Sequence, residues 1–414
     1  MLGIAQKSGH ELVTNTDDAD TLVVNTCAFI DEAKEESIDA ILELVQKKEQ
    51  SGGKKKLIVT GCLAQRYAKE LEIEIPEVDY FFGTSDYSLI NDVLGKPQNG
   101  TKNNLISLRS RVGKNLVGSE LSYLEKFDLP RINTSPSFSA YLRISEGCDN
   151  ACAFCIIPKL RGKQRSRAID DLVKEAEALA RQGVMELNLI GQDLTAYGFD
   201  LPGRPPLSEL LGSLALVPGI RWIRQMYAYP RTFSENYFKA FNHKNVLPYI
   251  DMPVQHGSAN VLRLMRRGGS KDRLSSIIKS LRSNIENLVL RTTVMVGFPG
   301  ETNDDFKELC DFVSENQFDR MGVFQYSNEE NTKAYDFTDQ VPKPIKEQRF
   351  HELMAIQRDI SAQKMQALIG TEQEVVVEGA SPEHELLVKG RIWSQAPDID
   401  GVTYVASASP LSVG

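Results

Sequence analysis

The stretch "SAYLRISEGCDNACAFCIIPKLRG", Ser139–Gly162, joins a short strand to three closely spaced cysteines. Cys148, Cys152 and Cys155 follow the strand directly, with the spacing C-x-x-x-C-x-x-C. The remaining cysteines are scattered along the chain: Cys27, Cys62 and Cys310. Half of the six thiols therefore belong to one loop, which favours a chemical role for them over simple packing.

Three thiolates on one loop can bind three irons of a 4Fe–4S cluster and leave the fourth iron open to a substrate or cofactor. A structural zinc site normally closes with four ligands, and the neighbouring sequence has no histidine or fourth cysteine. Zinc and a group of packing thiols remain as alternatives, and both are disfavoured by this spacing.

The strand before the cysteines is the first of six similar segments in residues 138–370, separated by segments with helical apolar spacing. The six are "SAYLRISEG", "VMELNLIG", "IRQMYAY", "LPYIDMPV", "LVLRTTVMVG" and "DRMGVFQYS". Repeated β/α units in about 230 residues predict a TIM-like or incomplete barrel. Functional residues of such a barrel gather on the loops that follow the strands.

Residues 1–95 repeat a strand, a cysteine-bearing turn and a helix, with Cys27 in the first turn and Cys62 in the second. Alternating strands and helices predict a flavodoxin-like parallel sheet. Both cysteines then lie beyond the carboxyl ends of strands, where open α/β sheets bind ligands. Buried structural cysteines are the alternative, but the matching placement favours a shared site. The helix after Cys27 is expected to pack through an apolar face made of Ile38, Ile41, Leu42 and Val45.

Residues 96–137, rich in Asn, Ser, Gly and Pro, read as an irregular linker. An amphipathic segment closes the barrel at Gly370, and residues 371–414 have the turn-punctuated pattern of a small β-barrel fragment. The charge is uneven: residues 1–95 carry 9 Lys and Arg against 18 Asp and Glu, residues 96–370 carry 37 against 31, and residues 371–414 carry 2 against 7. The middle is basic and both ends are acidic.

The first residues, "MLGIAQKSGHELV", lack the layout of an export signal. No run approaches the roughly 18 apolar residues of a membrane helix. The sequence therefore predicts a cytoplasmic protein without a membrane partner, in a compartment where clustered thiols hold metal more often than they form disulfides.

The cysteine loop, with Phe154 before the last cysteine, resembles the signature loop of radical S-adenosylmethionine (SAM) enzymes. The wider segments "GCDNACAFCIIPKLRGKQRSR", "LIGQDLTAYG", "YIDMPVQHGSANVLRLMRR" and "VGFPGETNDDF" resemble the methylthiotransferases of that superfamily. The resemblance implies that SAM occupies the open iron of the cluster at Cys148, Cys152 and Cys155. It also implies insertion of sulfur into a C–H bond, followed by methylation. The sequence singles out no catalytic side chain, because cofactors carry this chemistry.

In that family an N-terminal α/β domain holds a second, auxiliary 4Fe–4S cluster through three cysteines, and the resemblance assigns two of them to Cys27 and Cys62. The third has no counterpart, because the sequence begins at what resembles the middle of the family's first helix. We therefore expect the first strand and first cysteine to be missing, and the C-terminal TRAM domain to be partial. Nothing in the sequence makes Cys310 a substitute: it lies on an apolar helical stripe and is expected to pack in the core.

Further candidates follow the other barrel strands. Gly297 and Glu301 of "VGFPGET" resemble the segment that supports the adenosine end of SAM, although alone they read as a strand-to-helix turn. Gln192 and Asp193 are either polar loop residues or SAM contacts. His256 either bonds locally or lines the pocket. The last candidates form a basic run, which reads either as a solvated face or as contacts to a carboxylate of SAM or substrate: Arg161, Arg165 and Arg167.

The family's best-known substrates are an adenosine beside the tRNA anticodon and an aspartate β-carbon of a small-subunit ribosomal protein. A tRNA-binding module should be basic, whereas residues 371–414 are acidic. The segments "CAFCIIP" and "GRIWSQAPDIDGVTYV" also resemble the ribosomal-protein branch more than the tRNA branch. We therefore predict an aspartate methylthiotransferase served by a flavodoxin or ferredoxin-type electron donor. The alternatives are a tRNA methylthiotransferase acting on isopentenyladenosine and an inactive iron–sulfur binding protein.

Overall fold

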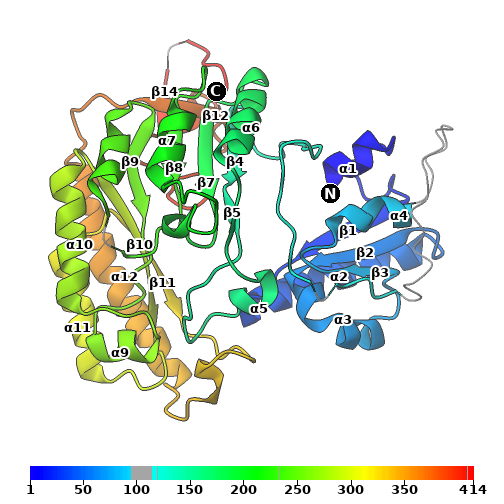
Figure 1. Ribbon diagram of the computed structural model, residues 1–414, viewed down its shortest axis with the longest axis horizontal. Coiled ribbons are helices and arrows are strands. Elements are labelled where there is room, and N and C mark those ends of the chain that lie inside the picture. The colour runs from blue at the N-terminus through cyan, green and yellow to red at the C-terminus, as the bar shows by residue number, and fades with distance from the viewer. Residues whose placement is uncertain (95–113, 119, 232, 408) are drawn as a thin grey trace.

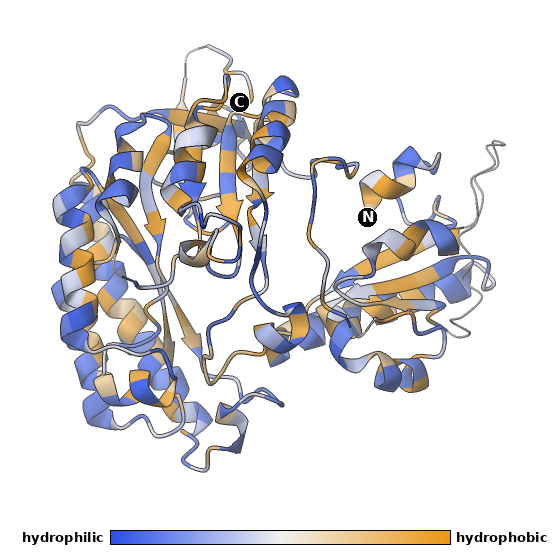
Figure 2. Cartoon of the chain, in the orientation of Figure 1, coloured by the Kyte–Doolittle hydropathy of each residue, from blue (hydrophilic) through white to orange (hydrophobic). Residues whose placement is uncertain are grey.

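The computed structural model of the chain describes residues 1–94, 114–118, 120–231, 233–407 and 409–414. Two α/β bodies lie side by side, each built on a parallel sheet, and a small antiparallel sheet packs on the larger body (Figure 1). Hydrophobic residues concentrate in the strands and on the helix faces turned toward them (Figure 2). The predicted fold class is confirmed.

The N-terminal sheet has the parallel order β1-β2-β3. Its strands are β1 (Thr21–Thr26), β2 (Lys56–Gly61) and β3 (Tyr80–Phe82), and its helices are α1 (Leu2–Lys7), α2 (Asp31–Gln50), α3 (Cys62–Glu74) and α4 (Ile90–Leu94). The central strand contains an unbroken apolar run, Leu57 to Val59, which is fully buried, as expected for a parallel strand covered on both faces. Thr26 pairs with Gly61, so β1 and β2 end level with each other. The two turns that carry cysteines are therefore neighbours.

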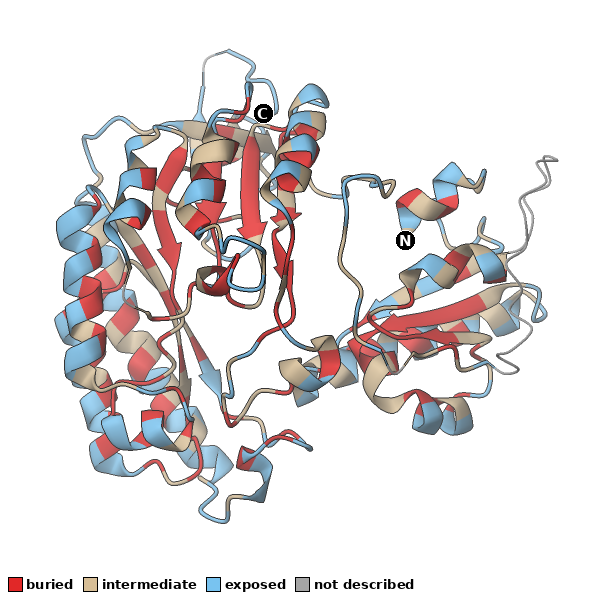
Figure 3. Cartoon of the chain, viewed as in Figure 1, coloured by how far each residue is buried: buried red, intermediate tan, exposed pale blue. Residues whose placement is uncertain are grey.

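The larger body contains six parallel strands whose spatial order follows the chain, β4-β7-β8-β9-β10-β11. The strands are β4 (Ser139–Arg143), β7 (Glu186–Ile190), β8 (Trp222–Gln225), β9 (Val246–Asp251), β10 (Val289–Val296) and β11 (Arg320–Gln325). Its main helices are α6 (Ile169–Arg181), α7 (Leu207–Ala215), α8 (Glu235–Lys239), α11 (Asn303–Asn316) and α12 (Lys343–Gln366). β4 and β11 are the edges of the sheet, so the barrel is open, and its strands are mostly buried (Figure 3).

One expected helical segment is interrupted. Residues 258–284 are one of the segments with helical apolar spacing, and the structure divides them into α9 (Ala259–Leu264) and α10 (Lys271–Asn284) with a break between them. Arg266, Gly268 and Gly269 all adopt positive φ angles there. Two consecutive glycines favour such a break because they lack the Cβ that penalises left-handed backbone.

The C-terminal residues form an antiparallel sheet of β12 (Val375–Ala380), β13 (Leu387–Ile392) and β14 (Thr403–Ala406). Val376 packs in a cluster with Trp222 and Tyr249 of the barrel strands. Because other members of this cluster, Phe138 and Leu247, lie at or next to the first residues of strands, the sheet covers the amino end of the barrel. The cysteine loop follows β4 at the opposite, carboxyl end.

Part of the predicted linker, residues 95–113, lies outside the described residues. The described remainder is irregular, with an isolated bridge between Asn115 and Phe81 of β3. Cys310 lies on α11 and packs against the main core, in agreement with the packing role expected for it. None of the helices in the described residues combines the length and apolarity needed to span a bilayer.

Candidate active site

The loop that carries Cys148, Cys152 and Cys155 is fixed at several points by backbone hydrogen bonds. At its base, β5 (Ser145–Glu146) pairs with β6 (Arg165–Ser166). The Cys148 N–H donates to the Gly162 carbonyl at 3.1 Å, and the Ala153 N–H donates to the Met265 carbonyl at 2.9 Å. Gly147 has a φ of 82°, and a Cβ there would collide with the Lys163 carbonyl. The sequence therefore needs glycine to turn the chain into the loop.

Nitrogen donors approach all three sulfurs, and the donor at Cys155 is the backbone N–H of Ile157. The backbone N–H and the side-chain amide of Asn150 each lie 3.4 Å from Cys148 Sγ. Arg267 Nη1 lies 3.6 Å from Cys152 Sγ. Burial raises the pKa of the Cys148 thiol, and that of Cys155 to about 12. Without metal the Cys148 and Cys155 thiols are protonated at neutral pH, so binding a cluster to them must release protons.

The donor chemistry fits an iron–sulfur cluster. Within the described residues, no three Cys, His, Asp or Glu side chains are already gathered as a metal site. The fit rests instead on three thiols of one loop, each approached by an N–H donor, and on nearby buried polar atoms that have no hydrogen-bond partner among the described residues. These orphaned atoms are Ser145 Oγ, both amide atoms of Gln164, Gln192 Oε1, Arg231 Nε and Arg267 Nε. Buried polar groups normally have partners, so this set is suited to a polar ligand beside the loop.

The predicted residues Gln192 and Asp193, which follow β7, are both brought to the loop. Asp193 is 1% exposed and accepts from Asn150 Nδ2 at 2.7 Å and from Arg231 Nη2 at 3.0 Å. Its carboxylate therefore orients the residue that contacts Cys148 Sγ. Gln192 donates to Glu146 at 3.1 Å, and its Oε1 has no hydrogen-bond partner among the described residues.

The turn after β10 is stabilised by a buried carboxylate. The carboxylate of Glu301 accepts the backbone N–H groups of Gly297 and Phe298 and pairs with Arg349 at 3.1 Å. Gly297 has a φ of 73°, which favours glycine. Glu301 thus supports the shape of the turn. His256 is fully buried, and its Nδ1 accepts the Ser258 N–H at 2.9 Å, so the local bond considered for it is present.

The three arginines of the basic run have separate partners. Arg167 is 1% exposed and pairs with Asp171 and Glu175 of α6, each at 2.6 Å, so neither a solvated face nor a SAM contact describes it. Arg165 donates to backbone carbonyls, including that of Arg161 at 3.0 Å. Only Arg161 reaches a cysteine.

Arg161 connects the cysteine loop to the N-terminal body. It ends α5 (Ile157–Arg161), the short helix after Cys155, and its Nη2 lies 3.3 Å from Cys62 Sγ. Its Nη1 lies 3.4 Å from the buried Glu146. Burial raises the pKa of Cys62, Arg161 opposes this, and Cys27 acts in the same direction as burial. Cys62 therefore faces the barrel through Arg161, and Cys27 lies on the neighbouring turn because β1 and β2 end level with each other.

Sequence reasoning did not identify Asn150, Arg231, Arg267 or the role of Glu146. Asn150 lies between the first two cysteines, so its position in the loop was an available signal. Arg231 and Arg267 come from later β/α units, and only the predicted gathering of loops at one end of the barrel pointed toward them.

A second link between the two bodies runs through Glu329, which is 3% exposed on the segment after β11. It accepts from Lys34 Nζ at 3.0 Å and from Arg66 Nη1 at 2.9 Å, both from the N-terminal body. Replacing Glu329 with Gln should weaken this link by about 1.5–3 kcal/mol, the usual range for hydrogen bonds to charged groups. We expect faster protease cleavage between the two bodies, measured by limited proteolysis. Glu347→Gln is the control, because the Glu347 side chain is exposed on α12 and contacts no residue of the N-terminal body among those described. Unchanged cleavage in Glu329→Gln would contradict the prediction.

Comparison with known proteins places this geometry in a family. The radical SAM superfamily matches residues 142–313, the uncharacterized family UPF0004 matches residues 1–83, and the TRAM domain matches residues 369–414. Among solved structures, the radical SAM methyltransferase TsrM from Kitasatospora setae aligns with a TM-score of 0.53 at 13% identity, over 74% of this chain and 63% of that one. At this identity the similarity concerns the fold alone.

Curated relatives are far more similar. The ribosomal protein uS12 methylthiotransferase RimO of Myxococcus xanthus is 50% identical over 98% of this chain and 82% of its own length. The RimO proteins of Geobacter sulfurreducens and Clostridioides difficile are each 45% identical, over 99% and 100% of this chain and 89% and 90% of their own lengths. The chain has a radical SAM barrel with three loop thiols at the carboxyl end of the barrel, and it is similar to these relatives along nearly its whole length. It therefore belongs to the RimO family of radical SAM methylthiotransferases.

Proposed function

We propose that this protein inserts sulfur at, and methylates, the β-carbon of an aspartate in ribosomal protein uS12. The observation that carries the proposal is the loop of Cys148, Cys152 and Cys155, seated at the barrel mouth and joined to Cys62 through Arg161. The similarity to curated RimO proteins supports the substrate. The acidic charge of residues 1–95 and 371–414 supports it too, because such surfaces attract a basic ribosomal protein and repel tRNA phosphates.

Cys148, Cys152 and Cys155 would hold the SAM-cleaving cluster. Such a 4Fe–4S cluster supplies, together with SAM, the one-electron chemistry that removes hydrogen from an unactivated carbon. Asp193 and Arg231 keep Asn150 against Cys148 Sγ.

The remaining site residues are assigned by position. Gln192 is the best candidate for a direct SAM contact, because its Oε1 is buried and unpartnered. Asp193 and Glu301 would not contact SAM directly. Asp193 would shape the cysteine loop, and Glu301 would shape the turn that includes Gly297. Cys27 and Cys62 would be ligands of an auxiliary cluster that supplies sulfur. A flavodoxin or ferredoxin-type protein would deliver the electrons.

The test is anaerobic turnover of the reconstituted protein with SAM and a reductant, offered purified uS12 and bulk tRNA in separate reactions. We expect mass spectrometry to find one added methylthio group on a single aspartate of uS12. Product on tRNA alone would overturn the proposed substrate. Failure to cleave SAM with either substrate would instead favour an inactive iron–sulfur protein.

A further inference from the structure

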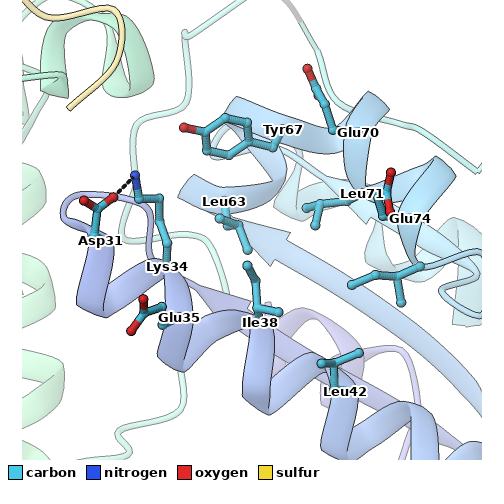
Figure 4. Close-up of a pocket in the computed structure, with 11 residues that line it drawn as sticks. Asp31, Lys34, Glu35, Ile38, Leu42, Leu63, Tyr67, Glu70, Leu71 and Glu74 are labelled. Carbon is cyan, nitrogen blue, oxygen red and sulfur yellow. Dashed lines mark ion pairs between the residues drawn. The ribbon is translucent and has the colours of Figure 1, made fainter. Parts of the chain in front are cut away.

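A groove of about 610 Å³ runs between α2 and α3 on the N-terminal body (Figure 4). Its lining is apolar along the floor and mostly acidic along the rim. The floor residues are Ile38, Leu42, Leu63, Tyr67, Leu71 and Ile75. The charged residues are Asp31, Lys34 and Glu35 from α2, and Glu70 and Glu74 from α3.

The floor is only partly covered by the fold: Leu63, Leu71 and Ile75 are buried at 2%, 7% and 7% exposure, whereas its α2 side remains accessible. The sequence predicts one apolar face on α2, but only Ile41 and Val45 are buried in the core. Ile38 and Leu42 turn toward α3 instead, and Leu42 is 42% exposed (Figure 4). The accessible apolar surface is therefore Leu42 with the half-buried Ile38 and Tyr67, and apolar surface bordered by charged residues commonly marks an interaction site.

The rim carries a net negative charge that the chain does not neutralise. Lys34 is the single cation among the lining residues, and it already pairs with Asp31 at 2.5 Å and with Glu329 at 3.0 Å. In the described part of the chain, Glu35, Glu70 and Glu74 have no ion-pair partner. The groove is therefore suited to an occupant that combines apolar side chains with positive charge.

One end of the groove lies at the proposed active site. α2 begins four residues after Cys27, and α3 begins at Cys62. Because parallel β/α units run in the same direction, both helices lead away from the cysteines together. Lys34 at this end also touches Glu329 of the barrel body, so the groove opens where the two bodies meet.

We propose that this groove binds a segment of the substrate protein that lies next to the modified aspartate and carries both basic and apolar side chains. The inference rests on the proposed function, which supplies a protein substrate. Ribosomal proteins are rich in Lys and Arg because they bind RNA, so their charge complements the three unpaired glutamates. The same glutamates repel a nucleic-acid backbone. The apolar floor adds contact area that charge alone would not provide.

The test measures binding of fluorescently labelled uS12 to the full chain by anisotropy. The groove variant carries Glu35→Lys, Glu70→Lys and Glu74→Lys. The control variant carries Glu36→Lys, Asp39→Lys and Glu43→Lys, which change the net charge equally at exposed positions of α2 outside the groove. We expect the dissociation constant to rise about tenfold or more in the groove variant and about twofold or less in the control, because close like charges are costly and distant ones are screened. Leu42→Asn should also weaken binding, with little dependence on salt.

Equal weakening in both charge variants, or no weakening in the groove variant, would overturn the inference. Melting temperatures of both variants confirm that they remain folded. Turnover of uS12 by the unmodified protein is measured in parallel. Product on uS12 with unaltered binding in the groove variant would refute the groove alone, whereas absence of product on uS12 together with product on tRNA would refute the proposed function.

Discussion

Replacing Cys148, Cys152 and Cys155 together with alanine is expected to remove about four irons per chain and to abolish SAM cleavage. The three thiols are the only cysteines of their loop, and each can ligate one iron of a 4Fe–4S cluster. Alanine has no atom that can ligate iron, and Asn150 and Arg267, which approach the sulfurs, cannot replace a thiolate. The measurements are iron per chain after anaerobic reconstitution and deoxyadenosine formed under reducing conditions.

The iron count also reports on Cys27 and Cys62. A fall from about eight irons to about four would mean that these two thiols hold a second cluster with a further ligand. A fall from about four to none would mean that the chain holds the SAM-cleaving cluster alone. Cys310→Ala is the control, because Cys310 packs on α11 against the core, and it should leave the iron count unchanged. Full iron retention in the triple variant would contradict the assignment of the loop.

The architecture was predictable because it follows from local periodicity. The alternation of strands and helices predicted a parallel sheet with Cys27 and Cys62 beyond the carboxyl ends of its strands, and the structure brings the two turns together because β1 and β2 end level. The same reasoning located the thiol loop at the carboxyl end of the barrel. Each of these inferences requires only neighbours in sequence and the general handedness of β/α units.

The contacts that orient the thiols were not predictable in this way. Arg231 reaches Asn150, and Arg267 reaches Cys152 Sγ, across 81 and 115 positions of sequence. Periodicity indicates that a loop lies near the site, but it does not identify which side chain reaches which atom. The basic run shows the same limit. The sequence left open a solvated face or contacts to a carboxylate of SAM or substrate, whereas Arg167 forms a buried ion pair with Glu175 and Arg161 contacts Cys62.

The junction between the barrel and the C-terminal sheet is another feature that local pattern could not supply. Glu186 of β7 accepts two bonds from Arg391 of β13, at 3.1 and 2.7 Å, and one from Arg224 of β8 at 3.2 Å. All three side chains are at most 2% exposed. A charge buried so deeply is tolerated only when it is paired and hydrogen-bonded. The carboxylate therefore holds two guanidinium groups from different domains.

Glu186→Gln is expected to lower the free energy of unfolding by about 3–5 kcal/mol, the usual cost of breaking a buried ion pair. The matched control is Arg221→Gln. Arg221 pairs with Glu374 at 2.6 Å across the same junction, but both side chains are more than half exposed, and such a pair is worth about 0–1 kcal/mol. Denaturant unfolding at neutral pH compares the two variants. Similar losses would contradict the view that burial, rather than the number of ion pairs, decides the strength of this junction.

The same carboxylate should make the junction sensitive to acid. Burial alone raises the pKa of Glu186, but Arg391 and Arg224 outweigh it and lower the pKa below its ordinary value. The unfolded chain therefore binds more protons than the folded chain at acidic pH, so the stabilisation is complete above the ordinary pKa, about 4.3, and is lost as pH falls through the lower folded pKa. The stability difference between the unmodified protein and Glu186→Gln, measured by thermal unfolding from pH 7 downward, should stay constant to about pH 5 and then shrink. Other carboxylates titrate equally in both proteins and cancel in this difference. A difference that grows on acidification would mean that Glu186 binds its proton more readily in the folded chain than in the unfolded one.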